Sequence, residues 1–175
     1  MKFTVEKNTL LKSLSHVQSI VEKKNTLPIL SNILLDAKEN SLILSATDMD
    51  ISITEKLNCN IIEEGSITVS AHTLYDIIRK LPDTSEIEII SNDGKIISLR
   101  SGKSKFSLGC LPKKDFPIIE ISDLEIEINI DSHKFLKLMD KTRFAISNEE
   151  TRYFLNGIYF HKKKEDHSNL LSVVA

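Results

Sequence analysis

Residues 3–20, FTVEKNTLLKSLSHVQSI, begin with apolar and polar residues in alternation, typical of a β-strand, and continue with apolar residues three or four apart, typical of an amphipathic helix. Two later stretches repeat this pattern: VSAHTLYDIIRKL at residues 69–81 and INIDSHKFLKLMDKTRFA at residues 128–145. At offsets of 64 and 125 residues the apolar positions coincide: Phe3 with Ile128, Val5 with Val69 and Ile130, Leu10 with Leu74 and Phe135, Leu11 with Tyr75 and Leu136, Leu14 with Ile78 and Met139. The recurrence predicts three copies of one strand–helix unit.

The junction between strand and helix has an equivalent polar position in each copy, occupied by Glu6, Ser70 and Asp131. The side-chain oxygen of serine or aspartate can accept a free amide of the first helical turn, so Ser70 and Asp131 are predicted N-caps. The charge of Glu6 also suits a helix N-terminus. After the first and third copies, Asn32 and Asn156 lead into further strands, which indicates that the repeat extends beyond the helix.

The pattern predicts an α+β protein of more than one domain. Turn residues at Glu39-Asn40, Asp93-Gly94 and Ser101-Gly102 predict hairpins between short strands. The segment LPKKDFPIIEISD from Leu111 is typical of a link between domains, so residues 1–122 are predicted to form one domain and residues 123–175 the first part of a second. The last residues are an apolar strand without its covering partners, and we expect a fragment of a longer chain. The alternative is that strand–helix units resemble one another by chance.

Charge is distributed unevenly along the chain, although the net charge is only -2 at pH 7. The three predicted helices, at residues 7–20, 72–80 and 133–146, carry eight basic and two acidic residues, whereas the rest of the chain carries 15 basic and 23 acidic residues. Basic helices on an acidic sheet layer favour one surface that faces phosphate groups. The alternative is that the charged helix faces are simply solvated.

Motifs for catalysis, metal binding or membrane insertion are missing from the sequence. Gly102-Lys103-Ser104 lacks the upstream glycine of a phosphate-binding loop, because Ile97 stands at that position. The run from His161 to His167 matches no standard metal-site spacing, and the five histidines are expected to be solvated. With no nucleophile-elbow pattern, no signal region and only Cys59 and Cys110 as thiols, we expect a cytoplasmic protein that is not an enzyme and holds no metal or cofactor.

Five segments, in order along the chain, resemble the bacterial DNA sliding clamps, the beta subunits of DNA polymerase III. They are MKFTVEKNTLLKSL from Met1, TLPILSNILLDA from Thr26, SATDMDISI from Ser45, RSGKSKFSLGCLPKKDFP from Arg100 and RYFLNGIYF from Arg152. The resemblance implies the DNA-clamp fold, in which each domain duplicates a strand–helix–strands unit, with two helices on the inner face and antiparallel sheets outside. It also implies a processivity factor, in which two subunits close head to tail around duplex DNA without reading its sequence. The alternative is a peptide-binding scaffold module of unrelated fold.

The resemblance also implies the residues that would contact DNA. They are Lys24, after the first helix, and Arg152, Tyr153 and Phe154, before the strand that follows Asn156. His72 stands where relatives often carry arginine, and Glu149 places an acid beside the group, so contact by this group is expected to be weak. The alternative is that Tyr153 and Phe154 are core residues.

Two further surfaces are implied by the resemblance. The edge strand formed by RSGKSKFSLG would meet the second subunit, with Phe106 and Leu108 in apolar contact and Lys103 and Lys105 facing acidic groups. The alternative is an ordinary half-buried edge strand. Leu155 would form one wall of a pocket that binds short peptides of the polymerase III alpha subunit and the clamp loader, and the other walls would lie beyond Ala175.

Overall fold

The computed structural model of the chain describes residues 1–22, 26–83, 85–117, 129–165 and 168–175. It divides into two compact units, Met1–Glu120 (unit 1) and Ile121–Ala175 (unit 2), each of which is considered by itself. The predicted domain boundary between residues 122 and 123 lies outside the described residues.

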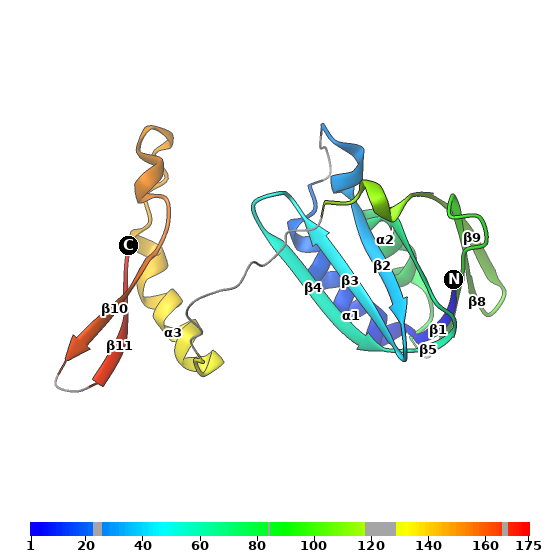
Figure 1. Ribbon diagram of the computed structural model, residues 1–175, viewed down its shortest axis with the longest axis horizontal. Coiled ribbons are helices and arrows are strands. Elements are labelled where there is room, and N and C mark those ends of the chain that lie inside the picture. Colours follow the sequence, from blue (N-terminus) through cyan, green and yellow to red (C-terminus); the bar gives the residue numbers. More distant parts are fainter. Residues whose placement is uncertain (23–25, 84, 118–128, 166–167) are drawn as a thin grey trace. The chain divides into compact units, whose positions relative to one another are not determined.

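Unit 1 contains two helices and one antiparallel sheet of nine strands, in the order β4-β3-β2-β6-β9-β8-β7-β1-β5 (Figure 1). The elements along the chain are β1 (Lys2–Glu6), α1 (Lys7–Val17), β2 (Asn32–Lys38), β3 (Ser41–Thr47), β4 (Ser52–Asn58), β5 (Asn60–Glu63), β6 (Gly65–Ser70), α2 (Ala71–Lys80), β7 (Glu86–Ile90), β8 (Ile96–Ser101) and β9 (Ser104–Leu111). Short 3-10 turns are η1 (Gln18–Ile20), η2 (Pro28–Ser31) and η3 (Lys113–Asp115). The predicted α+β class is confirmed.

The internal repeat gives unit 1 two equivalent halves that exchange strands. The first half is β1-α1-β2-β3-β4 and the second is β6-α2-β7-β8-β9. The first strand of each half pairs with the strand that follows the helix of the other half: β1 with β7, and β6 with β2. Each half therefore fills an open sheet edge of the other, and this reciprocal pairing makes the two halves one domain.

The core of unit 1 lies between the two helices and the sheet. Leu10 and Leu14 on α1 are fully buried, and so are Leu74 and Ile78 at the equivalent positions of α2. The two helices contact each other, and α1 also lies against β3 and β4 (Figure 1). Burying these side chains removes them from water, which contributes about 1.5–3 kcal/mol for each large aliphatic side chain. The predicted apolar faces of the two helices are thus the faces that form the core.

The predictions for turns and helix ends were only partly correct. Glu39, Gly94 and Gly102 adopt positive φ at the three predicted hairpin turns, and the strands on either side pair as expected. The Asp131 side chain accepts a hydrogen bond from the Lys134 amide at 3.0 Å, so this predicted cap is confirmed. The predicted cap at Ser70 is wrong, because its hydroxyl donates to the Thr73 hydroxyl and accepts no helix amide.

Lys7 corrects the expectation that the basic residues of the helices face phosphate. Its side chain is buried, and its ammonium group donates to the Leu81 carbonyl at 2.6 Å and to Asp83 Oδ1 at 2.7 Å. Its charge therefore fixes the end of α2 to the start of α1. The hydrogen bond and the charge of Lys7 lower the pKa of the Asp83 carboxyl below its usual value of 3.8.

This pair should give unit 1 a measurable sensitivity to acid. A carboxyl whose pKa is lower in the folded state contributes stability above its unfolded pKa and loses that contribution as the pH falls through its folded pKa. We therefore expect Asp83→Asn to flatten the fall in the free energy of unfolding below pH 3.8. The effect is modest, because Asp83 is exposed to solvent. Urea titrations at several pH values measure it. In a Lys7→Met background the Asp83→Asn change should have no further effect, and an undiminished effect there would contradict the pairing.

Unit 2 contains one helix and one hairpin among its described residues. These are α3 (Ser132–Thr142) and the antiparallel pair β10 (Tyr159–Glu165) and β11 (Ser168–Val174), with the turns η4 (Arg143–Ala145) and η5 (Glu150–Leu155) between helix and hairpin. Phe135 on α3 stacks on Phe160 of β10 with ring centroids 5.9 Å apart, which holds the helix on the hairpin. In the described part of the chain, no helix combines the length and the apolar character that crossing a bilayer requires.

Candidate nucleic-acid and subunit interfaces

The turn η5 carries a basic residue and two aromatic rings on the surface of unit 2. The side chains of Tyr153 and Phe154 are 79% and 72% exposed and meet edge to face, with centroids 5.9 Å apart. Arg152 Nε lies 3.2 Å from Glu149 Oε2. Tyr153 and Phe154 are therefore not core residues of unit 2. Exposed rings can lie against sugars or bases, and the guanidinium can pair with a phosphate, but Glu149 offsets part of its charge.

The other two predicted DNA contacts are Lys24 and His72, and the structure describes only His72. Lys24 lies outside the described residues. His72, in the first turn of α2, is half-buried: its Nε2 donates to the Val21 carbonyl at 3.0 Å, and its Nδ1 lies 3.1 Å from Gln18 Oε1. The expectation that every histidine is solvated is wrong here. His72 thus joins the start of α2 to the backbone that follows α1. The bonded residue, Val21, lies three positions before Lys24 in the sequence.

Among the described residues, strand β9 has a free sheet edge along most of its length. Ser104–Gly109 pairs with β8, whereas β6 pairs only with Cys110 and Leu111. Of the predicted edge strand, residues 100–109, Ser104–Gly109 form this edge, whereas Arg100 and Ser101 end β8 and Gly102 and Lys103 form the turn. Phe106 and Leu108 point inward and are half-buried against the core of unit 1, and Lys105 points outward. Lys103 is exposed in the turn before the strand.

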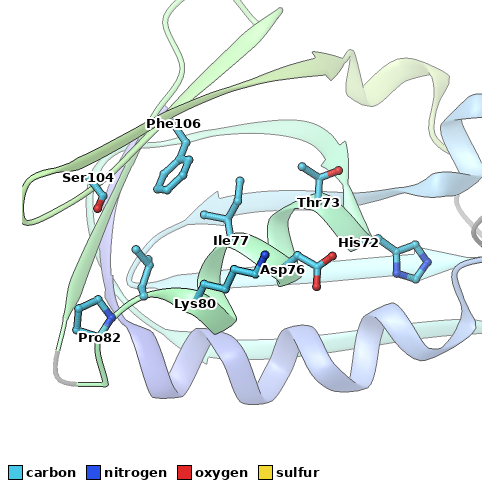
Figure 2. Close-up of a pocket in the computed structure, with 9 residues that line it drawn as sticks. His72, Thr73, Asp76, Ile77, Lys80, Pro82, Ser104 and Phe106 are labelled. Carbon is cyan, nitrogen blue, oxygen red and sulfur yellow. The ribbon is translucent and has the colours of Figure 1, made fainter.

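A cavity of about 440 Å³ lies beside this edge, between α2 and β9. Phe106 and Ile77 line it from β9 and α2 respectively, and Lys80 and Asp76 stand at its polar side (Figure 2). The other lining residues are His72, Thr73, Leu81, Pro82 and Ser104. Sequence reasoning missed Ile77 and Lys80. The helical period of α2 places Ile77 off the face that Leu74 and Ile78 bury. That position was the only sequence signal that could have identified Ile77 as a lining residue.

Leu155 ends η5 and is 45% exposed. Its carbonyl accepts a hydrogen bond from the Ser147 amide at 3.1 Å, which closes the loop on which Arg152 and the two aromatic rings lie. The aliphatic side chain is thus available on the surface of unit 2, at the position predicted for one wall of a peptide pocket.

The thiols and possible metal ligands in the described part of the chain form no reactive group. Burial raises the pKa of the Cys59 thiol, and it raises that of Cys110 to about 11, so both thiols are weak nucleophiles at neutral pH. No three His, Cys, Asp or Glu side chains cluster there in a way that could hold a metal ion.

Comparison with known families matches both units of the chain. The family described as DNA polymerase III beta subunit, N-terminal domain, matches residues 1–120, and the central domain of the same subunit matches residues 129–175. The beta sliding clamp of Caulobacter vibrioides is 48% identical over the whole of this chain, and that of Rickettsia felis is 40% identical over 95% of it. A crystal structure of the Caulobacter crescentus beta sliding clamp superposes on 99% of this chain with a TM-score of 0.94 and 47% identity. The chain spans 47% of the length of the C. vibrioides relative.

Proposed function

Because this chain belongs to the DNA polymerase III beta subunit family, we propose that it contributes to a sliding clamp, a ring that encircles duplex DNA and tethers the replicative polymerase to it. The match of two successive clamp domains to the two units carries this proposal. The role is mechanical: the clamp itself catalyses no reaction, and it needs no metal or cofactor. Its other partners would be repair proteins and the clamp loader, which engage it through short peptides.

The charge of the chain fits topological rather than tight binding. A closed ring cannot leave circular DNA, so its inner surface needs only enough positive charge to attract phosphates, and weak contacts permit sliding. A net charge of -2 is compatible with this role, because the contacts are few and local. In this proposal Lys24, Arg152, Tyr153 and Phe154 contact DNA, and His72 donates to the Val21 carbonyl.

The clamp function is tested on a full-length molecule that can close into a ring. Residues 1–175 of this chain are joined to the remaining segment of the C. vibrioides beta sliding clamp, and this molecule is called the clamp chimera below. After loading, the clamp chimera should stay on nicked circular DNA and slide off once the DNA is cut to a linear form. Equal retention on both forms, or none on either, would argue for an unrelated peptide-binding scaffold.

The proposed DNA contacts give a second expected result. Lys24→Ala and Arg152→Ala should each reduce the slope of log K against log salt for DNA binding of the clamp chimera by about one, because each removes one phosphate contact. Tyr153→Ala should weaken binding to primed DNA with a single-stranded overhang about fivefold to a hundredfold with the salt slope unchanged, since stacking on an unpaired base contributes about 1–3 kcal/mol. Fluorescence anisotropy at several salt concentrations measures both.

Lys56→Ala is the matched control for the lysine variant. Lys56 is exposed on β4, on the sheet face away from the side chain of Glu55, which pairs with His16 of α1. Removing this lysine changes the net charge by the same amount. If Lys24→Ala and Lys56→Ala reduce the slope equally, the effect is one of global charge and the assignment of Lys24 is wrong.

The free edge of β9 and the cavity beside it are the proposed contact surface for the second subunit. A free strand edge can accept a further strand, and an apolar pocket next to it can accept a side chain of that strand. Phe106, Leu108, Lys103 and Lys105 all lie on or beside this edge.

A further inference from the structure

One wall of the cavity beside β9 comes from the connector between α2 and β7, residues 81–85. Leu81 and Pro82 begin this connector and both line the cavity, and Figure 2 shows Pro82 directly after the end of α2. The facing residues Ile77 and Phe106 belong to a helix and to a paired strand, whereas Leu81 and Pro82 lie in neither. The shape of the cavity at this wall therefore depends on what holds the connector.

Lys7, the first residue of α1, holds the connector at three points. Its backbone amide donates to the Ser85 carbonyl at 3.0 Å, and its ammonium group donates to the Leu81 carbonyl at 2.6 Å and to Asp83 Oδ1 at 2.7 Å. The Ser85 amide and hydroxyl both donate to the Pro82 carbonyl, at 3.2 and 2.6 Å respectively. A single residue of α1 thus fixes the connector on both sides of Pro82.

The burial of Lys7 indicates that its bonds, and not its packing alone, matter at this position. Its side chain is 3% exposed, and lysine is almost never buried to this extent unless it is paired. Removing an ammonium group from water is unfavourable, and the bonds to the Leu81 carbonyl and to Asp83 offset that cost. An apolar side chain of the same length would fill the same space without this cost, but it would not hold the connector.

We propose that Lys7 is a positioning residue for the contact with the second subunit, and that it acts through Leu81 and Pro82. This inference rests on the proposed contact surface at the β9 edge. A partner side chain that enters the cavity between Phe106 and Ile77 meets a wall that is already fixed, so binding does not have to order the connector. Lys7 is buried within unit 1 and contributes only through the connector.

Lys7→Met in the clamp chimera tests this role. Replacing a buried charge with an apolar side chain of similar size often costs little stability, so unit 1 should still fold. The dissociation constant of the ring should rise at least about fivefold, because each of its two interfaces must then order the connector. Light scattering over a dilution series measures this constant. Lys7→Arg keeps the charge and the donors, and it should restore most of the ring.

Lys2→Met is the matched control. It removes the same charge and breaks an ion pair of β1, in which Lys2 Nζ lies 3.1 Å from Glu88 Oε1, but neither residue lines the cavity. The ring should persist in this variant.

Amide hydrogen exchange in the 175-residue chain reports on the connector itself. The Leu81 and Ser85 amides donate to the Ile78 and Pro82 carbonyls, and both should exchange faster in Lys7→Met. A general loss of stability would accelerate the exchange of the β3 amides as well, and we expect these to remain unchanged.

The outcomes separate this inference from the proposed interface. If Phe106→Asp opens the ring and Lys7→Met does not weaken it, the interface stands and the role of Lys7 is wrong. That role is also wrong if Lys2→Met weakens the ring as much as Lys7→Met does, or if the Leu81 and Ser85 amides exchange no faster in Lys7→Met. If neither Phe106→Asp nor Lys7→Met weakens the ring, the β9 edge is not the contact surface and both proposals are overturned.

Discussion

Phe106→Asp is expected to convert the ring of the clamp chimera into monomers. Phe106 lies in the middle of the free edge of β9 and forms one wall of the cavity against α2. A partner strand that pairs with this edge would cover the cavity, and its apolar side chain would enter between Phe106 and Ile77. An aspartate at position 106 would then be buried without a partner, which is unfavourable.

The expected size of this effect follows from the symmetry of the ring. A head-to-tail ring of two subunits has two identical interfaces, so each substitution acts twice. Losing the burial of one aromatic side chain weakens an interface by at least about tenfold, and the ring by at least about a hundredfold. Light scattering at micromolar concentration measures the mass, and retention on nicked circular DNA should be lost with it.

Two further variants separate ring opening from misfolding. Phe106 also packs on the core of unit 1, so the substitution lowers stability, and thermal unfolding must show that unit 1 still folds. Reversing the exposed Lys103 and Lys105 to glutamate leaves the core untouched and should also weaken the ring. Ile62→Asp replaces an exposed apolar residue on β5, at the far end of the sheet, and should leave the ring closed. A persistent dimer in the folded Phe106→Asp variant would refute the proposed interface.

The sequence predicted those parts of the fold that depend on local order. The spacing of Leu10 and Leu14 identified the buried face of α1, and Asp93-Gly94 identified the hairpin between β7 and β8. Aligning Val5 with Val69 revealed the repeat, although not the exchange of first strands. That exchange joins strands that are distant in the sequence, as in the pairs Lys2 with Ile90 and Asn32 with Ser70. Helical and strand periods are set by neighbouring residues, and this is why a single sequence shows them.

The features that the sequence did not predict depend on distant partners. Lys7 was counted among the phosphate-facing basic residues, but the Leu81 carbonyl and Asp83, brought close by the packing of α1 and α2, hold it inside. His72 was expected in solvent, and its bond to the Val21 carbonyl joins α2 to the backbone that follows α1. Both side chains have partners more than 50 residues away, and no local pattern indicates them. The cavity against Phe106 has the same origin, because its walls come from β9 and α2.

Peptide binding should be lost almost completely in the 175-residue chain compared with the clamp chimera. A pocket that binds an apolar peptide side chain must surround it, because a single wall leaves most of that side chain in water. Leu155 is the one residue of this chain that the resemblance to sliding clamps assigns to the pocket, and it is 45% exposed on η5. In the clamp chimera the added segment would supply the remaining walls.

Calorimetric titration with one short clamp-binding peptide of the polymerase III alpha subunit measures the difference. The clamp chimera should bind the peptide at least about a hundredfold more tightly than the 175-residue chain does, since burying two apolar anchor residues contributes about 3 kcal/mol or more. Leu155→Asp in the clamp chimera should remove most of this gain, because it places a charge in an apolar wall. Arg152→Ala, also exposed on η5, is the matched control and should bind the peptide as before. Tight binding by the 175-residue chain, undiminished by Leu155→Asp, would show that the peptide site lies elsewhere on the described units and that Leu155 has no part in it.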